Sequence, residues 1–596
     1  ANILGTLNTA IGRSALASDT KGNNSVAVGY NTLNAQNFTS ATDVYNTAVG
    51  YAAGASVTTA TLNTLIGGLA GDAITTGGAN TAVGYSALTT STTGSNNTSI
   101  GRESLRVTTT GSNNVGVGSY AMYDNTTGAS NVAIGESALS NNTTASDNTA
   151  VGKSALLANT TGAQNTAVGV SALQANTTGA GNVAVGYAAL DASTTHGGNT
   201  AVGYNAATNT VTTGVTAVGY QAMLTNTTGY DTVAVGQSAL TANTTGHSNV
   251  AVGFNCMLIN TTGASNVAMG NGALDSNTTA SNNTAVGKSA LGANTTGIHN
   301  TFVGHASGDA ITTASYNTGM GSGALGANIL SGANVAVGQD ALANHNIASA
   351  ANGFNIGIGT NAGAAVTTGI QNTFVGGNSG AVSTGQNNTS VGVFSAGGAV
   401  STGNHNTAFG YAGLYELTGG SNNLSLGSDA GRATSPSGSI TTASNRIVLG
   451  NNYITHAYIK VDWTVTSDAR DKTDFTPLDL GLDFVKALQP ITYKWDMRSN
   501  YGDSEAEGYD LNDQTPDGTH KEDWLDIGFK AQEVEALEIA AGYDKSNNTN
   551  LISDYTDDGN SMGLRYAKFV PILVKAIQEQ QALIEALTAR ITTLEG

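Results

Sequence analysis

A 17-residue repeat runs through the first 450 residues and limits the possible folds of this chain more than any other feature. One unit reads Asn-Thr-Ala-Val-Gly-Lys-Ser-Ala-Leu from Asn148, continues to Asn-Thr-Thr-Gly at 159–162, and begins again at Asn165. The glycine that ends the Asn-Thr-Ala-Val-Gly motif recurs about 26 times. A short fixed period repeated this often predicts a solenoid, in which each unit buries its apolar face against its neighbours.

Each repeat is suited to short strands and not to helices. The apolar stretch of a unit spans about five residues before the Asn-Thr-Thr-Gly turn, which is too short for a helix of two turns. Val, Thr and Ile favour extended backbone, and glycine accepts the positive φ that a tight corner requires. We therefore expect a mainly β fold, a β-solenoid or β-roll fibre over 1–450. Its thin interior would be lined by Ala150 and Ala155 and filled by Val151 and Leu156.

Three intervals between repeat glycines exceed 17 residues by four or more. The intervals 29–50 and 338–359 span 21 residues, and 427–450 spans 23. We expect loops that bulge from the solenoid at these places.

The charge distribution excludes several function classes. Only 10% of the 596 residues are charged, against about 25% in ordinary soluble domains. Residues 467–596 hold 12 Lys/Arg and 25 Asp/Glu (12 − 25 = −13), so the first 466 carry −6 of the net −19. Without a basic stripe, nucleic acid is not an expected partner. The chain has no run of 18 apolar residues, so membrane insertion is not expected either.

The repeats offer little for chemistry. A glycosidase needs two neighbouring carboxylates, but the acids of this region, such as Asp72, Glu103, Glu136 and Asp340, are scattered. We therefore expect no glycan-cleaving activity. The histidines lack metal-ligand spacing and Cys256 is alone, so no metal and no cofactor are expected. Glycosylation at Asn-Thr-Thr and an ice-binding threonine face remain lesser alternatives.

The sequence changes character near residue 450. After a last repeat strand at 445–450, apolar residues alternate in a way that favours half-buried strands over 451–466, which we interpret as a strand-rich cap and connector. The alternating positions are Tyr453, Tyr458, Ile459, Val461, Trp463 and Val465. Ala1 lies directly in the repeat, so we expect an anchoring region upstream of it.

The segment 467–472, Ser-Asp-Ala-Arg-Asp-Lys, marks the start of a third region, 467–596. Ser467 and Lys472 are the two groups that a hydroxyl nucleophile and an amine base require. A lysine amine acts as a base near neutral pH only where burial lowers its pKa. The same spacing is also typical of a solvated turn.

The C-terminal stretch 570–594 carries a heptad pattern that predicts a coiled coil. One heptad position holds Val570, Ile577, Ile584 and Ile591, and the other holds Leu573, Gln580, Leu587 and Leu594. A core helix within one chain is the alternative.

Two resemblances to known families extend these interpretations. The repeats resemble the head domains of trimeric autotransporter adhesins, whose period is somewhat shorter. The C-terminal region resembles the intramolecular chaperone auto-processing domain of endosialidase-type phage tail spikes and fibres. Four blocks carry the second resemblance: 467–472, 482–495, 527–534, and Tyr566 with 570–580.

The chaperone resemblance implies a small α+β domain that trimerises, assists folding of the fibre and then cuts itself off. It implies Ser467 as nucleophile, Lys472 as general base, Thr466-Ser467 as the scissile bond, and Asp468 and Arg470 as supporting residues. The whole chain then resembles a homotrimeric phage tail fibre or spike in the virion tail. Such a fibre would bind a host cell-surface glycan or protein receptor and other virion tail proteins. A bacterial cell-surface trimeric adhesin with the same chaperone is the alternative.

Overall fold

The chain divides into two compact units, which we describe separately. The computed structural model describes residues 5–461, 463–502, 508–547, 549–556 and 558–596. The first unit comprises Ala1–Asn334 and Asn346–Asn352, and the second comprises Val335–His345 and Gly353–Gly596.

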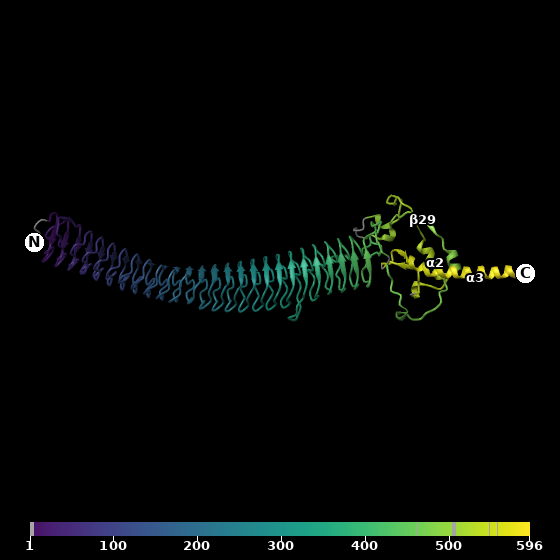
Figure 1. Cartoon of the computed structure of the whole chain (residues 1–596), viewed down its shortest axis with the longest axis horizontal. Coiled ribbons are helices and arrows are strands. Elements are labelled where there is room, and N and C mark those ends of the chain that lie inside the picture. The colour runs from purple at the N-terminus through teal and green to yellow at the C-terminus, as the bar shows by residue number, and fades with distance from the viewer. Residues whose placement is uncertain (1–4, 462, 503–507, 548, 557) are drawn as a thin grey trace. The chain divides into compact units, whose positions relative to one another are not determined.

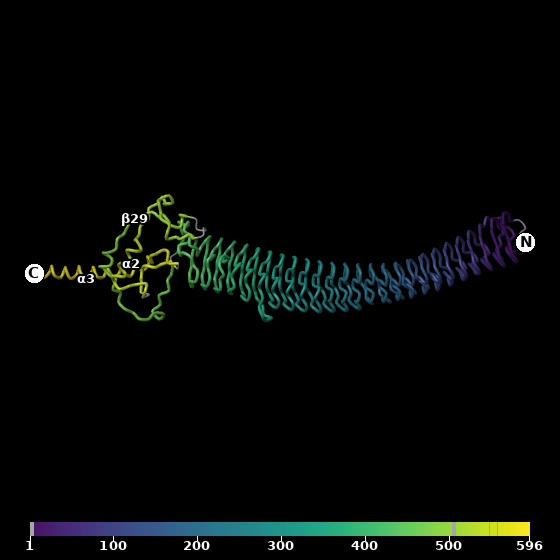
Figure 2. The backbone as a smooth tube through the Cα atoms, turned by 180° about the vertical axis from the view of Figure 1, so that it is seen from behind, coloured from purple at the N-terminus to yellow at the C-terminus, as the bar shows by residue number. Residues whose placement is uncertain are grey.

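In the first unit each repeat forms one coil, and the strands of successive coils pair in parallel (Figure 1). Thr149 pairs with Thr166, 17 residues later, so the sequence period is the period of the coils. Figure 2 shows the coils as a series of flattened loops. The strands are β1 (Thr9–Ile11), β2 (Gly22–Asn23), β3 (Val26–Val28), β4 (Thr42–Asp43), β5 (Thr47–Val49), β6 (Thr64–Ile66), β7 (Thr81–Val83), β8 (Thr98–Ile100), β9 (Val115–Val117), β10 (Val132–Ile134), β11 (Thr149–Val151), β12 (Thr166–Val168), β13 (Val183–Val185), β14 (Thr200–Val202), β15 (Val215–Val218), β16 (Thr232–Val235), β17 (Val250–Val252), β18 (Val267–Met269), β19 (Thr284–Val286), β20 (Thr301–Val303) and β21 (Thr318–Met320).

Three of the four residues predicted to form the interior of the coil at β11 are buried. Ala150, Ala155 and Leu156 are fully buried, as expected. Val151 is not: it is partly exposed, like Thr149 at the other end of β11. Because side chains alternate across a strand, burying the central alanine turns both of its neighbours outward. The expectation that Val151 fills the core is therefore wrong.

Two rows of buried asparagines lie in the interior beside the buried alanines and leucines. The backbone N–H of Asn165 donates to Asn148 Oδ1 at 2.9 Å, and its side-chain amide donates to the carbonyl of Gly179, also at 2.9 Å. In the second row, the Asn159 amide donates to Asn142 Oδ1 and to the carbonyl of Gly162. These bonds satisfy polar groups that water does not reach, which is the condition for burying them.

A glycine follows each strand of the main sheet because the backbone of the next coil lies against it. Gly152 has φ of +133°, and a Cβ there would lie 2.4 Å from the carbonyl oxygen of Gly169. Both the dihedral angle and the space exclude other residues.

The second unit begins with seven further repeat strands. These are β22 (Val335–Val337), β23 (Ile356–Ile358), β24 (Thr373–Val375), β25 (Thr389–Val391), β26 (Thr407–Phe409), β27 (Leu424–Leu426) and β28 (Ile447–Leu449). The extra residues of the three long intervals lie outside the strands of the main sheet, as expected. In the first interval β4 pairs with β2 in a separate two-stranded sheet; residues 348–352 are exposed, and 432–437 form turns and bends.

The connector 451–466 does not form the predicted strand-rich cap, so this prediction is wrong. Its described residues, 451–461 and 463–466, contain no strand. Tyr458 and Val465 are 93% and 80% exposed. The alternating pattern is present, but a strand forms only where a neighbouring strand accepts its hydrogen bonds. The domain limits at 450 and 466 remain predictions.

The last part of the second unit is a small α+β region that ends in a long helix (Figure 1). Its elements are η1 (Ala469–Asp471), α1 (Leu482–Ala487), β29 (Ile491–Tyr493), η2 (Arg498–Asn500), η3 (Leu511–Asp513), β30 (Asp526–Gly528), α2 (Ala531–Ala540), η4 (Lys545–Asn547), β31 (Ser553–Tyr555), β32 (Met562–Leu564), η5 (Tyr566–Lys568) and α3 (Phe569–Glu595). Its core is apolar and contains Leu480, Phe484, Leu488, Val534, Ile552, Phe569 and Ile572.

Candidate functional site

Ser467 and Lys472 lie in direct contact. Lys472 Nζ is 2.5 Å from Ser467 Oγ and 3.4 Å from the carbonyl oxygen of the same serine. The short helix η1 separates them, and its tight turn brings residues five apart together. Asp468 caps this turn by accepting a hydrogen bond from the Arg470 backbone N–H at 2.9 Å. The structure thus brings together the two residues that the sequence singled out.

Asp468 and Arg470 pair with each other. Arg470 Nη2 lies 2.6 Å from one carboxylate oxygen of Asp468, and Nε lies 3.1 Å from both. These hydrogen bonds hold the pKa of Asp468 below its ordinary value. The pair therefore stabilises the turn that positions Ser467 and Lys472.

The site is open in the isolated chain. Thr466, Ser467 and Lys472 are all exposed. The geometry of a serine–lysine pair is therefore present at an exposed position.

Helix α3 presents an apolar stripe with no cover from the rest of the described chain. Phe569, Ile572 and Ala576 at its start are buried. The alternative prediction, a core helix within one chain, therefore holds only for the first two turns of α3. The seven apolar residues of the predicted seam are exposed by 43% to 79%, and Gln580 is exposed as well. They are Val570, Leu573, Ile577, Ile584, Leu587, Ile591 and Leu594. A stripe of this kind is typical of a helix that associates with other helices.

An apolar groove of about 400 Å³ lies where α3 leaves the domain. Two seam residues, Val570 and Leu573, form part of its wall. The other lining residues are Val485, Leu488, Pro490, Phe529, Tyr566 and Phe569. The groove and the stripe therefore form one continuous apolar surface.

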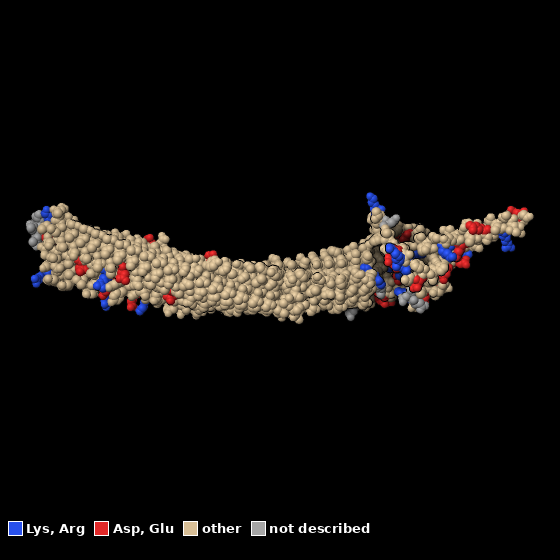
Figure 3. All heavy atoms as spheres, turned by 60° about the horizontal axis from the view of Figure 1, so that its bottom comes forward, with Lys and Arg blue, Asp and Glu red and all other residues tan. Residues whose placement is uncertain are grey.

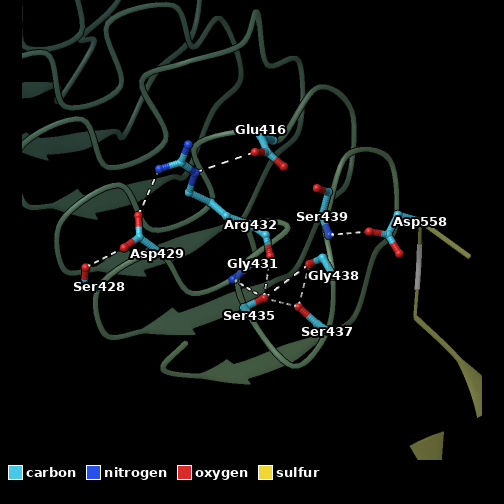
Figure 4. Close-up of polar contacts among 10 residues, drawn as sticks. All are labelled: Glu416, Ser428, Asp429, Gly431, Arg432, Ser435, Ser437, Gly438, Ser439 and Asp558. Carbon is cyan, nitrogen blue, oxygen red and sulfur yellow. Dashed lines mark hydrogen bonds and ion pairs between the residues drawn. The ribbon is translucent and has the colours of Figure 1, made fainter. Parts of the chain in front are cut away.

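A hydrogen bond between Ser439 and Asp558 joins the loop before β28 to the hairpin β31–β32 (Figure 4). Asp558 accepts hydrogen bonds from Thr556 Oγ1 at 2.6 Å, from the Asn560 N–H at 3.0 Å and from the Ser439 N–H at 3.1 Å. The loop itself is held by Arg432, which contacts Asp429 at 3.0 Å and Glu416 at 3.6 Å.

Sequence reasoning missed two carboxylates of this domain. One is Asp558, and the other is Glu538 on α2, which is fully buried. Glu538 accepts backbone hydrogen bonds from Leu551, Ile552 and Ser553. The Glu538 partners lie 13 to 15 residues away and Ser439 lies 119 residues from Asp558, so no local pattern in the sequence could have indicated these contacts.

Charged residues gather in the C-terminal region and are sparse over the coils (Figure 3). Among the described residues, no cluster of three or more His, Cys, Asp or Glu side chains could hold a metal ion. No helix in the described ranges has the length and hydropathy needed to cross a lipid bilayer.

The fold and this geometry define a class of protein: a β-solenoid with a C-terminal α+β domain that begins at a serine–lysine pair. Residues 467–543 match the family described as the chaperone of endosialidase, so the chain carries a domain of this family. The match begins at Ser467. No curated protein matches the chain. A β-solenoid joined to a chaperone domain of this family fits a trimeric protein like a tail fibre.

Proposed function

We propose that the chain is the precursor of a trimeric tail fibre or spike that cuts itself between Thr466 and Ser467 after assembly. The observation that carries this proposal is the 2.5 Å contact between Lys472 Nζ and Ser467 Oγ at the first residue of the chaperone match. The released part, 467–596, would be the chaperone, and the part that remains would be the fibre.

The two side chains can perform the cut without a cofactor. Lys472 takes the hydroxyl proton, Ser467 Oγ bonds to the carbonyl carbon of Thr466, and the peptide C–N bond breaks as the lysine returns the proton to the Ser467 amine. Water then hydrolyses the resulting ester, which leaves a carboxylate on Thr466 and a free hydroxyl on Ser467. Each step follows the logic of a hydroxyl nucleophile activated by an adjacent base.

Assembly would bury the serine–lysine site, which is exposed in the isolated chain. Three α3 helices that join through their exposed seams would bring three chaperone domains together and cover the open serine–lysine sites. Burial then lowers the pKa of a lysine amine and makes it a competent base. Cutting would therefore follow trimerisation. The fibre, once separated from its chaperone, would unfold only slowly.

The fibre itself is proposed to bind a host cell-surface glycan or protein, and its base other virion tail proteins. The chaperone family supports a location in a phage tail or outside the cell. A bacterial cell-surface adhesin with the same domain is the second candidate, supported by the resemblance of the repeats to autotransporter heads.

Mass spectrometry of the full chain tests the cut. We expect two products after incubation, 1–466 and 467–596, the second with Ser467 at its N-terminus. Ser467→Ala and Lys472→Ala should stay uncut. Thr473→Ala is the matched control, because its hydroxyl contacts Asp474 and should leave cutting unchanged. Intact mass for all four proteins, or equal cutting by all four, would refute the proposal.

A further inference from the structure

Seven aromatic side chains of the first unit share one position, directly after the glycine that ends a strand, and we call this position the post-glycine row. Each of them is 45% to 61% exposed. Where two lie on successive coils, their rings stack: the ring centres of Tyr187 and Tyr204 are 5.1 Å apart, with planes 13° from parallel. The faces of these rings therefore point along the stack of coils. The seven are Tyr30, Tyr51, Tyr85, Tyr187, Tyr204, Tyr220 and Phe254.

In one place a glycine stands between two tyrosines of this row. Tyr51 and Tyr85 follow β5 and β7, and Gly68 follows β6, which pairs with both strands. Gly68 lacks the positive φ of the strand-ending glycines, and a Cβ there would meet Tyr85 Cδ2 at 3.7 Å, an ordinary van der Waals contact. Neither the dihedral angle nor the space requires glycine, and its missing side chain leaves a slot between the two rings.

The width of this slot selects a class of ligand. Successive coils lie about 4.8 Å apart, so ring planes two coils apart are separated by about 9.6 Å. Carbon atoms in contact lie about 3.5–4.0 Å apart, so a flat ring held between two others needs only about 7 Å. A pyranose chair is thicker, because its axial C–H bonds stand out from both faces. The slot therefore suits a sugar ring better than a planar aromatic ligand.

The surroundings favour a neutral ligand with a polar rim. Tyr51 and Tyr85 are 61% and 58% exposed, and their phenol hydroxyls have no hydrogen-bond partner among the described residues. Arg102, the next residue in the row, has its guanidinium 3.3 Å from Glu103 and 5.2 Å from the centre of the Tyr120 ring, so its charge is already paired. A sugar ring offers C–H faces to the aromatic rings and hydroxyls to the phenols, which have an apolar body and a polar tip.

We propose that Tyr51, Gly68 and Tyr85 form a binding site for one neutral pyranose ring whose substituents are all equatorial, such as a β-glucoside. Such a ring presents axial hydrogens, and no axial hydroxyl, to both tyrosines. A galactoside, with its axial hydroxyl at C4, can present a fully apolar face to only one of them. The proposal rests on the host-binding role proposed for the fibre, and it selects a glycan as the receptor of this part.

The chain offers a reciprocal pair of variants. Gln237 is exposed and stands between Tyr220 and Phe254 in the same row, where its side chain occupies the equivalent slot. Gly68→Gln fills the first slot with a side chain that the coil already accepts at this position, and Gln237→Gly opens a second slot. Ser322→Gln, at another exposed position of the row, is the control. Circular dichroism of each full chain checks that the coils are intact.

Saturation-transfer difference NMR with methyl β-D-glucopyranoside and methyl β-D-galactopyranoside tests the site. For the full wild-type chain we expect transfer to the ring hydrogens on both faces of the glucoside and weaker transfer to the galactoside. Gly68→Gln should lose the transfer, Gln237→Gly should increase it, and Ser322→Gln should match wild type. Equal transfer from wild type and Gly68→Gln, no gain from Gln237→Gly, or equal transfer to both glycosides would overturn the proposal.

Mass spectrometry of the same samples keeps this inference separate from the proposed function. Cutting at Ser467 without transfer to the glucoside would overturn the sugar site and leave the self-cutting fibre standing. Transfer that Gly68→Gln abolishes, in a chain that is never cut, would support the sugar site and refute the proposed precursor.

Discussion

The carboxylate of Asp558 accepts a hydrogen bond of 3.1 Å from the backbone N–H of Ser439, 119 residues earlier in the chain. Gly438 makes this approach possible, because a Cβ at that position would lie 2.5 Å from both carboxylate oxygens. The hairpin of the chaperone domain therefore contacts the loop before β28 through a position that only glycine can fill. After a cut at Ser467, contacts of this kind would be noncovalent links between the two products.

This contact should depend on pH. Partial burial raises the pKa of Asp558, but hydrogen bonds from Thr556, Asn560 and Ser439 outweigh it, and the net shift is downward. A lowered pKa contributes stability that is complete above the unfolded value of about 3.9 and is lost as the pH falls through the folded value. We expect the protection factor of the Ser439 amide in hydrogen exchange to be constant from pH 7 to pH 5 and to fall below pH 4. Asp558→Asn should remove this dependence, and an unchanged profile would contradict the assignment.

Gly152→Ala should disrupt the coil around β11. The substitution forces a side chain into φ of +133° and towards the Gly169 carbonyl, and strain of the dihedral angle alone costs about 1–3 kcal/mol. We expect a lower unfolding temperature or loss of soluble protein. Gly181→Gln is the control, because Gly181 has open space around it and lies 17 residues after Gln164, which has φ of +61°. It should be nearly neutral, and equal damage from both variants would argue against the packing described.

Asn165→Leu should destabilise the solenoid although leucine has the same branching at Cγ. The substitution leaves the Gly179 carbonyl and the Asn182 backbone N–H without their partners, and each orphaned buried group costs about 1–3 kcal/mol. Chemical denaturation of the full chain should show an earlier transition. Thr161→Ala, an exposed turn residue of the same coil, should leave the transition in place.

Ile584→Lys should prevent both assembly and cutting. It places a charge in the exposed seam of α3, where it would be buried between chains. Sedimentation should then show a single chain, and mass spectrometry should show the uncut protein. Ala582→Lys lies on the opposite side of the helix and is exposed, so it should assemble and cut normally. Cutting by monomeric Ile584→Lys would separate the chemistry from assembly and refute that link.

The sequence by itself determined the period, the strands of the repeats and the pairing of Ser467 with Lys472. The 17-residue spacing of glycines such as Gly152 and Gly169 is a local requirement of dihedral angle and space, so it can be read directly. Ser467 and Lys472 are joined by one tight turn, and their contact needs no distant part of the chain.

Only the tertiary structure decided which side of each strand is inside. Val151 is more apolar than Ala150, and its hydropathy favours the core, yet it points outward because the neighbouring alanine of the same strand points inward. The same holds for Glu538, Asp558 and the asparagine rows, because the fold brings them close to hydrogen-bond partners from distant parts of the chain. Hydropathy is a property of one residue, whereas the inward face of a strand and its hydrogen-bond partners depend on chain segments that only the fold places side by side.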